Sequence, residues 1–561
     1  MGKNHLVLVN IDGQEIQVPQ GITMIEAAEI AGKEVPHYCY HPKLSVAGNC
    51  RMCLVEMGMP IKDRSSGALI LDELGKPKIG WMPKPAIACN SKVSPGLHIK
   101  TNSAKVKDCR NGVMEFLLVN HPLDCPICDQ AGECRLQEFA SDYGRGYSRF
   151  IEDKNVKPKR TRIGPRVMLD DERCILCSRC VRFCDEVVDD PVLGFIDRGS
   201  YSTLTCYPGK QLENNYSLNT VDICPVGALT STDFRFKMRV WFLKKTPSIC
   251  TESSTGVNTI VWSREGKIYR ITPRRNDEVN DTWMPDSGRQ LHRVTELENR
   301  VNQYRVSGKV SNAQETIEKV VALLKAGKVG YIISGHSSLE EQFLMGKIIK
   351  CIPGAIGMIA QQQEEDTILI SKDATPNLRG TLVLGLLKSP PAPKLSHIGN
   401  KIDLGEIKTL FVNEDDLLAG GLTEKQLEKV QIIYLGSRKN HTSKFADIVL
   451  PGVTVFEKYG TFINQQFRIQ KFEAAIPPPN PLVDNRVSLV KILKWLLPEN
   501  DPSSCEINSL WNEISASVKA LEGIHYSKLS EFGIVINQEN WEKDPFCEGK
   551  SLHYSPVNTR K

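Results

Sequence analysis

Residues 39–53 read CYHPKLSVAGNCRMC and place three thiols, Cys39, Cys50 and Cys53, in one short segment. A fourth thiol, Cys89, follows in the sequence AIACN. Thiols clustered at such short spacings act as metal ligands far more often than as packing residues. The sequence therefore predicts a site with four thiolate ligands, three from one loop and one from a remote segment.

The residues before this loop indicate the fold that carries it. Residues 5–19, HLVLVNIDGQEIQVP, predict a β-hairpin that turns at Asp12 and Gly13. Thr23 and Glu26 form a capping box for a following helix, which Gly32 is placed to end. A hairpin, a helix and then a cysteine loop resembles the β-grasp ferredoxin.

The ferredoxin comparison favours a [2Fe–2S] cluster at this first group. Plant-type ferredoxins space their ligands C-x4-C-x2-C with a remote fourth, whereas the first gap here is ten residues long. The longer loop still supplies three ligands, and the fourth comes from a remote segment. Gly48 suits a loop that wraps closely round sulfide. Zinc is the main rival because C-x2-C pairs are common in zinc sites. The β-grasp pattern before Cys39 favours iron and sulfur.

A second group contains a histidine. The run NHPLDCPICDQAGEC has the spacing H-x3-C-x2-C-x5-C, with the candidate ligands His121, Cys125, Cys128 and Cys134. Residues 103–120 predict a helix, capped by Ser103, that leads to the histidine. A lone histidine is usually not a ligand. His121 lies four residues before the first of three clustered thiols, which favours a role as a ligand of a [4Fe–4S] cluster. Cys109 is the alternative fourth ligand.

A third group has the spacing of bacterial two-cluster ferredoxins. CILCSRCVRFC is a C-x2-C-x2-C-x3-C run, in which the fourth cysteine serves the other cluster. The matching Cys-Pro pair is Cys224-Pro225, but the other three ligand positions of that second copy hold Asn214, Ser217 and Thr220. We therefore expect one [4Fe–4S] cluster, with Cys184 left unused, held by Cys174, Cys177, Cys180 and Cys224.

Composition sets the class of protein. A chain of 561 residues with 41% hydrophobic residues is expected to form two to four domains. We find no secretory signal and no run of about 18 apolar residues, so the 18 cysteines indicate a reducing compartment rather than disulfides. The net charge of +5 is too small for a nucleic-acid partner. The basic stretch 154–166 is either a solvated connector or a docking strip for an acidic partner.

From about residue 313, predicted helices and strands alternate. Strand-like runs at 329–334, 409–413 and 431–435 are separated by helix-like runs, which predicts a parallel sheet with helices on both faces. The tail from about residue 500 is polar and is expected to be irregular.

The order of the three groups, ending in CPVGAL, resembles the large iron–sulfur subunit family of bacterial NADH:quinone oxidoreductase, which lies in the peripheral arm of respiratory complex I. The match covers residues 1–235, and KTPSICTESSTGVNTIVWSREGKIYRI and IVLPGVTVFEKYGTFINQQFRIQ extend it more weakly into a molybdopterin-oxidoreductase-like region. The resemblance implies a multidomain α/β fold with an N-terminal β-grasp [2Fe–2S] ferredoxin domain.

The family's domains place the boundaries of this chain. The implied modules are a [2Fe–2S] ferredoxin-type domain at 1–98, a one-histidine/three-cysteine [4Fe–4S] module at 99–145, a bacterial-ferredoxin-like [4Fe–4S] module with one cluster at 146–240, a Mo/W bis-MGD-type [4Fe–4S] domain at 241–300, a molybdopterin-oxidoreductase-like α/β domain at 301–500 and an irregular tail at 501–561.

Departures from the family pattern predict what is missing. Some relatives hold a further four-iron cluster at 241–300, but three of its four ligand positions here are Ser253, Val257 and Pro285, and only Cys250 remains. No thiolate is placed to hold molybdenum, because Cys351 ends an amphipathic helix and is expected to be a buried packing residue. We therefore expect neither that cluster nor molybdopterin.

The resemblance also implies the function. Electrons would come from a partner subunit that carries FMN and oxidises NADH, pass through one [2Fe–2S] and two [4Fe–4S] clusters, and go on toward quinone, while the whole complex translocates ions. The chain has no G-x-G-x-x-G fingerprint, so it would relay electrons and contribute no catalytic residue. The implied place is the cytoplasmic side of the bacterial inner membrane, held peripherally through other peripheral-arm subunits and so indirectly by the membrane arm.

Other functions share parts of this pattern. An iron–sulfur subunit of a soluble NAD-linked hydrogenase should keep the second ferredoxin cluster, and a formate dehydrogenase should keep the molybdenum ligand. A zinc-binding scaffold would use the same thiols without redox chemistry.

Overall fold

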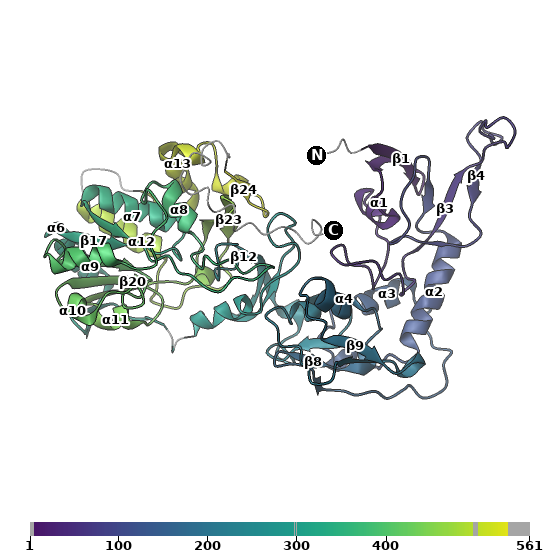
Figure 1. Cartoon of the computed structure of the whole chain (residues 1–561), viewed down its shortest axis with the longest axis horizontal. Helices are drawn as coiled ribbons and strands as arrows, with labels where there is room; N and C mark the ends of the chain where they lie inside the picture. Colours follow the sequence, from purple (N-terminus) through teal and green to yellow (C-terminus); the bar gives the residue numbers. More distant parts are fainter. Residues whose placement is uncertain (1–4, 297, 299, 498–502, 537–561) are drawn as a thin grey trace. The chain divides into compact units, whose positions relative to one another are not determined.

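The computed structural model describes residues 5–296, 298, 300–497 and 503–536. The chain forms two compact units, Met1–Trp241 and Phe242–Lys561, and each is described by itself (Figure 1). Among the described residues no helix is long and apolar enough to span a membrane.

The first unit begins with a mixed sheet in the order β2-β1-β6-β3-β4, with β5 paired to β3. The predicted hairpin is confirmed, and its turn needs the positive φ of Asp12 (51°) and Gly13 (89°). The capping box of Thr23 and Glu26 is confirmed at the start of α1. The bounds are β1 Leu6–Ile11, β2 Gln14–Pro19, α1 Met24–Ile30, β3 Leu54–Pro60, β4 Ile79–Trp81, β5 Ala86–Ile87 and β6 His98–Lys100.

This sheet closes over α1 to form a small core. Val9, Ile11 and Val18 of the hairpin pack with Ala27 and Ala28 of the helix, all at most 1% exposed. Cys53 and Cys89 belong to the same cluster of buried residues. The fold of the β-grasp part therefore sets the position of two of the four thiols directly.

The remainder of the first unit consists of short elements around the other two cysteine groups. The predicted helix after Ser103 is confirmed as α2, whose N-cap is the Ser103 side chain. The bounds are α2 Ala104–Leu118, η1 Cys125–Ile127, α3 Arg135–Tyr143, β7 Thr161–Arg162, β8 Val167–Leu169, η2 Asp171–Arg173, α4 Arg179–Glu186, β9 Leu193–Ile196, β10 Thr203–Cys206, α5 Asn219–Asp222 and β11 Leu229–Ser231.

The second unit is built on a sheet in the order β16-β15-β21-β20-β19-β17-β18. The five strands from β21 to β18 are parallel, as the alternating pattern predicts. The strand bounds are β15 Arg305–Val306, β16 Lys309–Val310, β17 Val329–Ile332, β18 Gly354–Gly357, β19 Thr409–Asn413, β20 Gln431–Gly436 and β21 Ile448–Pro451.

Helices cover both faces of this sheet (Figure 1). Alternate residues of the strands enter two different cores, because successive side chains of a strand point to opposite faces. Phe411 and Ile433 pack with the helices α6, α7 and α12, whereas Leu410 and Ile432 pack with α9 and α10. The helix bounds are α6 Ala313–Lys325, α7 Leu339–Cys351, α8 Leu378–Val383, α9 Ser396–Asp403, α10 Glu424–Leu427, α11 His441–Phe445 and α12 Asn485–Leu496.

Two smaller sheets complete the second unit. The hairpin predicted near residue 260 is present as β13 and β14, and it pairs with β12. A further sheet has the order β22-β23-β24. The bounds are β12 Lys244–Ile249, β13 Asn258–Arg264, β14 Lys267–Pro273, η5 Gly288–Thr295, β22 Gly460–Ile463, β23 Arg468–Phe472 and β24 Ile534–Val535.

The expectation of an irregular tail is wrong for residues 503–536. Helix α13 (Ile507–Ser517) presents Leu510, Trp511 and Ile514 to the core, and all three are fully buried. Trp511 Nε1 also donates a hydrogen bond to Glu340 Oε1 at 2.7 Å. The apolar residues recur at helical spacing, so periodicity would have found this helix. The expectation for residues 537–561 lies outside the described residues.

We predict that Trp511→Ala destabilises the second unit by about 3 kcal/mol, because it leaves a cavity and removes a donor from a buried carboxylate. The measurement is the opening free energy of α7 amides, from hydrogen exchange of the full chain in both forms. Trp495, which is 49% exposed, is the matched control, and Trp495→Ala should change that energy by at most about 0.5 kcal/mol. Equal exchange in parent and Trp511→Ala would show that α13 does not dock.

Candidate cluster-binding sites

The structure brings the four thiols of the first group together. Cys39 and Cys50 lie in the loop between α1 and β3, Cys53 directly precedes β3, and Cys89 follows β5. Cys53 Sγ and Cys89 Sγ are 3.4 Å apart. Contacts with Cys50 and Cys89 lower the pKa of Cys39, and contacts with Cys39 and Cys53 raise the pKa of Cys89.

The loop of the first group adopts the backbone shape that the ten-residue gap requires. Gly48 (φ 63°) and Arg51 (φ 59°) are both left-handed, which turns the chain on either side of Cys50. Cys39, Cys53 and Cys89 are at most 1% exposed, so this site is largely dry. Buried, convergent thiols are what a cluster held by four thiolates requires.

The second group surrounds the C-terminal end of α2. Lys154 Nζ donates to the carbonyls of Leu118 and Val119, each at 2.9 Å, and thereby caps the helix that leads to His121. Cys128 is buried, whereas Cys125 lies exposed at the start of η1.

Electrostatics of the second group suit metal ligands. Burial, together with Lys154 and Arg173, lowers the pKa of His121 to about 4, so the imidazole is neutral near pH 7 and has a free lone pair. Burial raises the pKa of Cys134 to about 11, and the nearby Cys128 and Cys125 contribute to that rise. The charge of Arg173 reaches both His121 and Cys128, so imidazole and thiol share one neighbourhood.

Cys109 occupies a different part of α2 from His121. It lies nine residues before Leu118, which is about 13 Å along the helix axis at 1.5 Å per residue. The imidazole therefore emerges at the helix end, while the competing thiol lies in its middle.

The structure also brings the third group together. Cys174 follows η2, Cys180 lies in α4 and Cys224 follows α5. Burial raises the pKa of Cys177 to about 11 and that of Cys180 well above its usual range, and the neighbouring thiols add to both shifts. Four thiols that shift one another's titration lie within one small space.

Backbone amides are directed at the sulfurs of the third group. Leu176 (φ 54°) and Ser178 (φ 60°) are left-handed, and the Leu176 amide donates to Cys174 Sγ at 3.4 Å. Burial raises the pKa of Cys224, and the amides of Val226, Ala228 and Leu229 oppose that rise by donating hydrogen bonds to its sulfur. Amide donors of this kind hold negative charge on sulfur and tune a cluster.

One buried cation near these thiols lacks a full set of partners. Arg179 Nε is buried and has no hydrogen-bond acceptor among the described residues, while the guanidinium lies close enough to influence Cys177 and Cys224. An unused N–H donor beside four thiols fits a sulfide-containing cluster. Among the described residues no group of three or more His, Cys, Asp or Glu side chains is placed to hold a single metal ion.

The second and third groups meet at the segment after Cys224. Cys134 Sγ lies 3.9 Å from the carbonyl oxygen of Pro225. A Cβ at Gly227 would collide with Cys128 Sγ, so only glycine fits there. The first and second groups approach each other at Tyr38, a fully buried side chain whose pKa is raised by burial and further by Cys134 and Cys50.

The three positions that depart from the two-cluster ferredoxin spacing are filled by polar packing. Ser217 and Thr220 are fully buried, and Thr220 Oγ1 donates to the Ser217 carbonyl at 2.7 Å. Asn214 Nδ2 donates to Asp190 Oδ2 at 3.0 Å. Cys184 is also fully buried on α4, and burial raises its pKa to about 12.

The four positions near residue 250 are tightly packed as well. Cys250, Ser253, Val257 and Pro285 are all buried. A Cβ at Gly288 would lie 2.6 Å from Cys250 Sγ, so the backbone approaches this thiol closely. Cys351, at the end of α7, is partly buried against the core of the second unit.

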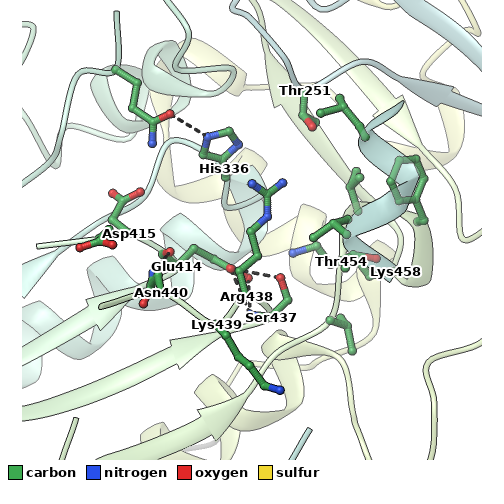
Figure 2. A pocket seen from close by; sticks show the side chains of 17 residues that line it. Thr251, His336, Glu414, Asp415, Ser437, Arg438, Lys439, Asn440, Thr454 and Lys458 are labelled. Atoms are coloured by element: carbon green, nitrogen blue, oxygen red, sulfur yellow. Dashed lines mark hydrogen bonds between the residues drawn. The ribbon is translucent and has the colours of Figure 1, made fainter. Parts of the chain in front are cut away.

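A cavity of about 250 Å³ lies at the carboxyl ends of the parallel strands, where open α/β sheets bind ligands. Figure 2 shows His336, Asp415 and Arg438 toward one side and Thr454 and Lys458 toward the other. No thiol is among the 17 described residues that line it. Burial raises the pKa of Asp415 to about 8.

Three lysines of the basic stretch 154–166 contact other parts of the chain. They are therefore neither freely solvated nor free to bind a partner. Lys154 caps α2, Lys157 pairs with Asp171 at 3.3 Å, and Lys159 pairs with Glu172 at 2.8 Å. Long-range pairing of this kind gives no signal in the local sequence.

Comparisons with known proteins agree with this arrangement. Five family models match successive parts of the chain. They are a 2Fe-2S iron-sulfur cluster binding domain (4–104), an NADH-ubiquinone oxidoreductase-G iron-sulfur binding region (110–149), an NADH-quinone oxidoreductase subunit 3 ferredoxin-like domain (164–230), an NADH-ubiquinone oxidoreductase NDSU1/NuoG-like 4Fe-4S domain (243–292) and molybdopterin oxidoreductase (293–481).

These matches bear out the predicted fold class. The chain has an N-terminal 2Fe-2S domain, 4Fe-4S ferredoxin-like domains and a C-terminal molybdopterin-oxidoreductase-like α/β domain. One solved structure, an NAD+-reducing [NiFe]-hydrogenase in the H2-reduced state, is 26% identical with a TM-score of 0.34, covering 42% of this chain and 91% of that one. That likeness is too weak to indicate fold or function.

Two curated relatives are similar to part of the chain. The G subunit of NADH-quinone oxidoreductase from Rickettsia conorii is 40% identical over 352 residues, which is 62% of this chain and 49% of the relative. The mitochondrial NADH dehydrogenase [ubiquinone] iron-sulfur protein 1 of Solanum tuberosum is 43% identical over 284 residues, 51% of this chain and 35% of the relative. The matched part thus spans about half or less of each relative's length. The chain is therefore similar to the G subunit of NADH-quinone oxidoreductase, and two of the matching family models are named for subunits of the same enzyme.

Proposed function

We propose that this chain is an electron-relay subunit of an NADH:quinone oxidoreductase and that it carries three iron–sulfur clusters. The observation that carries the proposal is the convergence of each cysteine group within the single compact unit Met1–Trp241. Three redox centres in one compact unit suit a relay, because electrons must pass between sites that are held at fixed spacings.

The assignment of clusters follows the three groups. A [2Fe–2S] cluster would be held by Cys39, Cys50, Cys53 and Cys89, one [4Fe–4S] cluster by His121, Cys125, Cys128 and Cys134, and the other by Cys174, Cys177, Cys180 and Cys224. Each cluster, when bound, takes up and releases one electron. The chain's own residues hold the ligands, donate amide hydrogen bonds to sulfur and keep water away, as the burial of Cys53 and Cys180 supports.

The second unit would serve as a scaffold. The packing of Gly288 against Cys250 supports the absence of a further four-iron cluster, and we propose that this unit holds no molybdopterin. We propose that the modules of the chain end at residues 98, 145, 240 and 300.

The partners follow from the proposed place in the complex. Electrons would arrive from a subunit that carries FMN and oxidises NADH, and would leave through other peripheral-arm subunits toward quinone, with ion translocation by the membrane arm. The chain would lie on the cytoplasmic side of a bacterial inner membrane and be held there through those subunits.

We predict that the chain, purified without oxygen, is brown and carries about ten irons, the sum of two, four and four. The measurement is iron and acid-labile sulfide per chain, together with zinc. Colourless protein with stoichiometric zinc would contradict the relay function and favour a scaffold.

We predict that Cys180→Ala removes about four irons, because a four-iron cluster loses one of its ligands. Cys184→Ala is the matched control, since Cys184 lies one helical turn further along α4, is also buried and has no cluster to hold. Iron per chain should stay at the parental value in this control. Loss of iron from Cys184→Ala would instead assign this thiol as a ligand.

We predict that His121→Cys lowers the midpoint potential of one four-iron centre, because a thiolate adds a negative charge where the imidazole is neutral. An EPR-monitored redox titration measures the potential and the signal shape. Cys109→Ser serves as the control and should leave both unchanged. If His121→Cys matched the parent while Cys109→Ser shifted, the thiol on α2 would be the fourth ligand.

A further inference from the structure

Helix α4 has two faces that serve two different cysteine groups. Cys180, Phe183 and Cys184 are buried on one side of the helix, and Cys180 belongs to the third group. Arg179, Arg182 and Glu186 recur at positions i, i+3 and i+7, so they share the other side of the helix. These three side chains all contact the loop that carries the first group.

Arg182 joins a ligand residue of one group to a ligand residue of the other. Its Nη2 donates to the Cys39 carbonyl at 2.6 Å and to the Cys177 carbonyl at 3.3 Å. Its Nη1 donates to the Ser45 carbonyl. A planar guanidinium presents several donors in a fixed geometry, so one side chain sets the separation of two cysteine backbones.

Arg179 makes a second connection of the same kind. Its Nη2 donates to the Tyr40 carbonyl at 2.5 Å, one residue after Cys39, and its Nη1 donates to the Ile223 carbonyl at 3.0 Å, one residue before Cys224. The two arginines therefore each span from the first group to the third.

Polar contacts on either side complete the attachment of the loop. The Glu186 carboxylate accepts hydrogen bonds from the Ser45 amide, at 2.8 Å, and from the Ser45 hydroxyl. Asn49 Nδ2 donates to the Leu176 carbonyl at 3.1 Å. The segment from Cys39 to Asn49 is thus fastened along α4 and the turn that precedes it.

The charges of the arginines act on both groups. The guanidinium groups of Arg179 and Arg182 lie against both groups, because they donate to the carbonyls of Tyr40, Cys39 and Cys177. A cation near a cluster favours its reduced, more negative form and so raises its potential.

We propose that Arg179 and Arg182 are positioning residues that hold the two-iron site of the first group against the four-iron site of the third and raise the potentials of both. The inference rests on the proposed function. The step served is the exchange of one electron between the two centres, in which one is oxidised as the other is reduced and no bond is made or broken.

The test uses the full chain with Arg182→Gln, Arg182→Lys and the control Arg198→Gln, which removes the same charge from an exposed position. EPR-monitored titration gives the potentials, and hydrogen exchange of residues 40–49, measured with and without iron, reports the attachment of the loop. Arg182→Gln should change the oxidised-to-reduced ratio of both centres about tenfold at fixed ambient potential, which is about 59 mV for a one-electron couple. It should also speed exchange in the loop.

The other variants separate charge from geometry. Arg182→Lys keeps the charge but lacks the fork, so the potentials should stay near the parental values while loop exchange remains fast. Arg198→Gln should change neither.

Two results would contradict the proposed role of Arg182. They are parental potentials and exchange in iron-loaded Arg182→Gln, or parental loop exchange in Arg182→Lys if Arg182→Gln fails to fold. A parent chain that binds no clusters would contradict the proposed function instead, and loop exchange in the iron-free variants would still decide whether Arg182 holds the loop.

Discussion

Crowded sulfur in a dry space is the constraint on which the first unit depends. The thiols of the third group are buried and raise one another's pKa, so thiolates there would repel and lose solvation. A cationic iron core offsets both costs, and a protein that holds it must supply fixed ligands and N–H donors. The left-handed residues Leu176 and Ser178 and the amides at Cys224 meet that need. Helix α4 and the loops around it hold the thiols and the backbone amides in these positions.

The second unit buries charged side chains in ion pairs. Lys458 pairs with Glu341 at 2.5 Å and Arg300 with Glu457 at 2.5 Å, and all four side chains are at most 4% exposed. Pairing of this kind satisfies charges that would otherwise be costly to bury. These ion pairs balance buried charge in the second unit, whereas Arg182 of the first unit donates to the carbonyls of two cysteines, Cys39 and Cys177.

Local patterns predicted local structure well. The turn at Asp12 and Gly13, the capping box at Thr23 and the alternation from residue 313 each depend on neighbours in sequence, and the structure contains all of them. Spacing along the chain also groups the proposed ligands, because most ligands of one cluster lie near one another in sequence. Contacts between distant segments were not found. Nothing near Arg182 in the sequence indicates that its partners are Cys39 and Ser45. The polar composition of the tail hides the burial of Trp511 against α7, which only the helical spacing of its apolar residues indicates.

The most direct test of three clusters in one unit is an anomalous difference map, recorded at the iron absorption edge from crystals grown without oxygen. We predict three separate peaks, all within Met1–Trp241, beside Cys53, His121 and Cys180. A peak beside Cys250, or the absence of one beside His121, would contradict it.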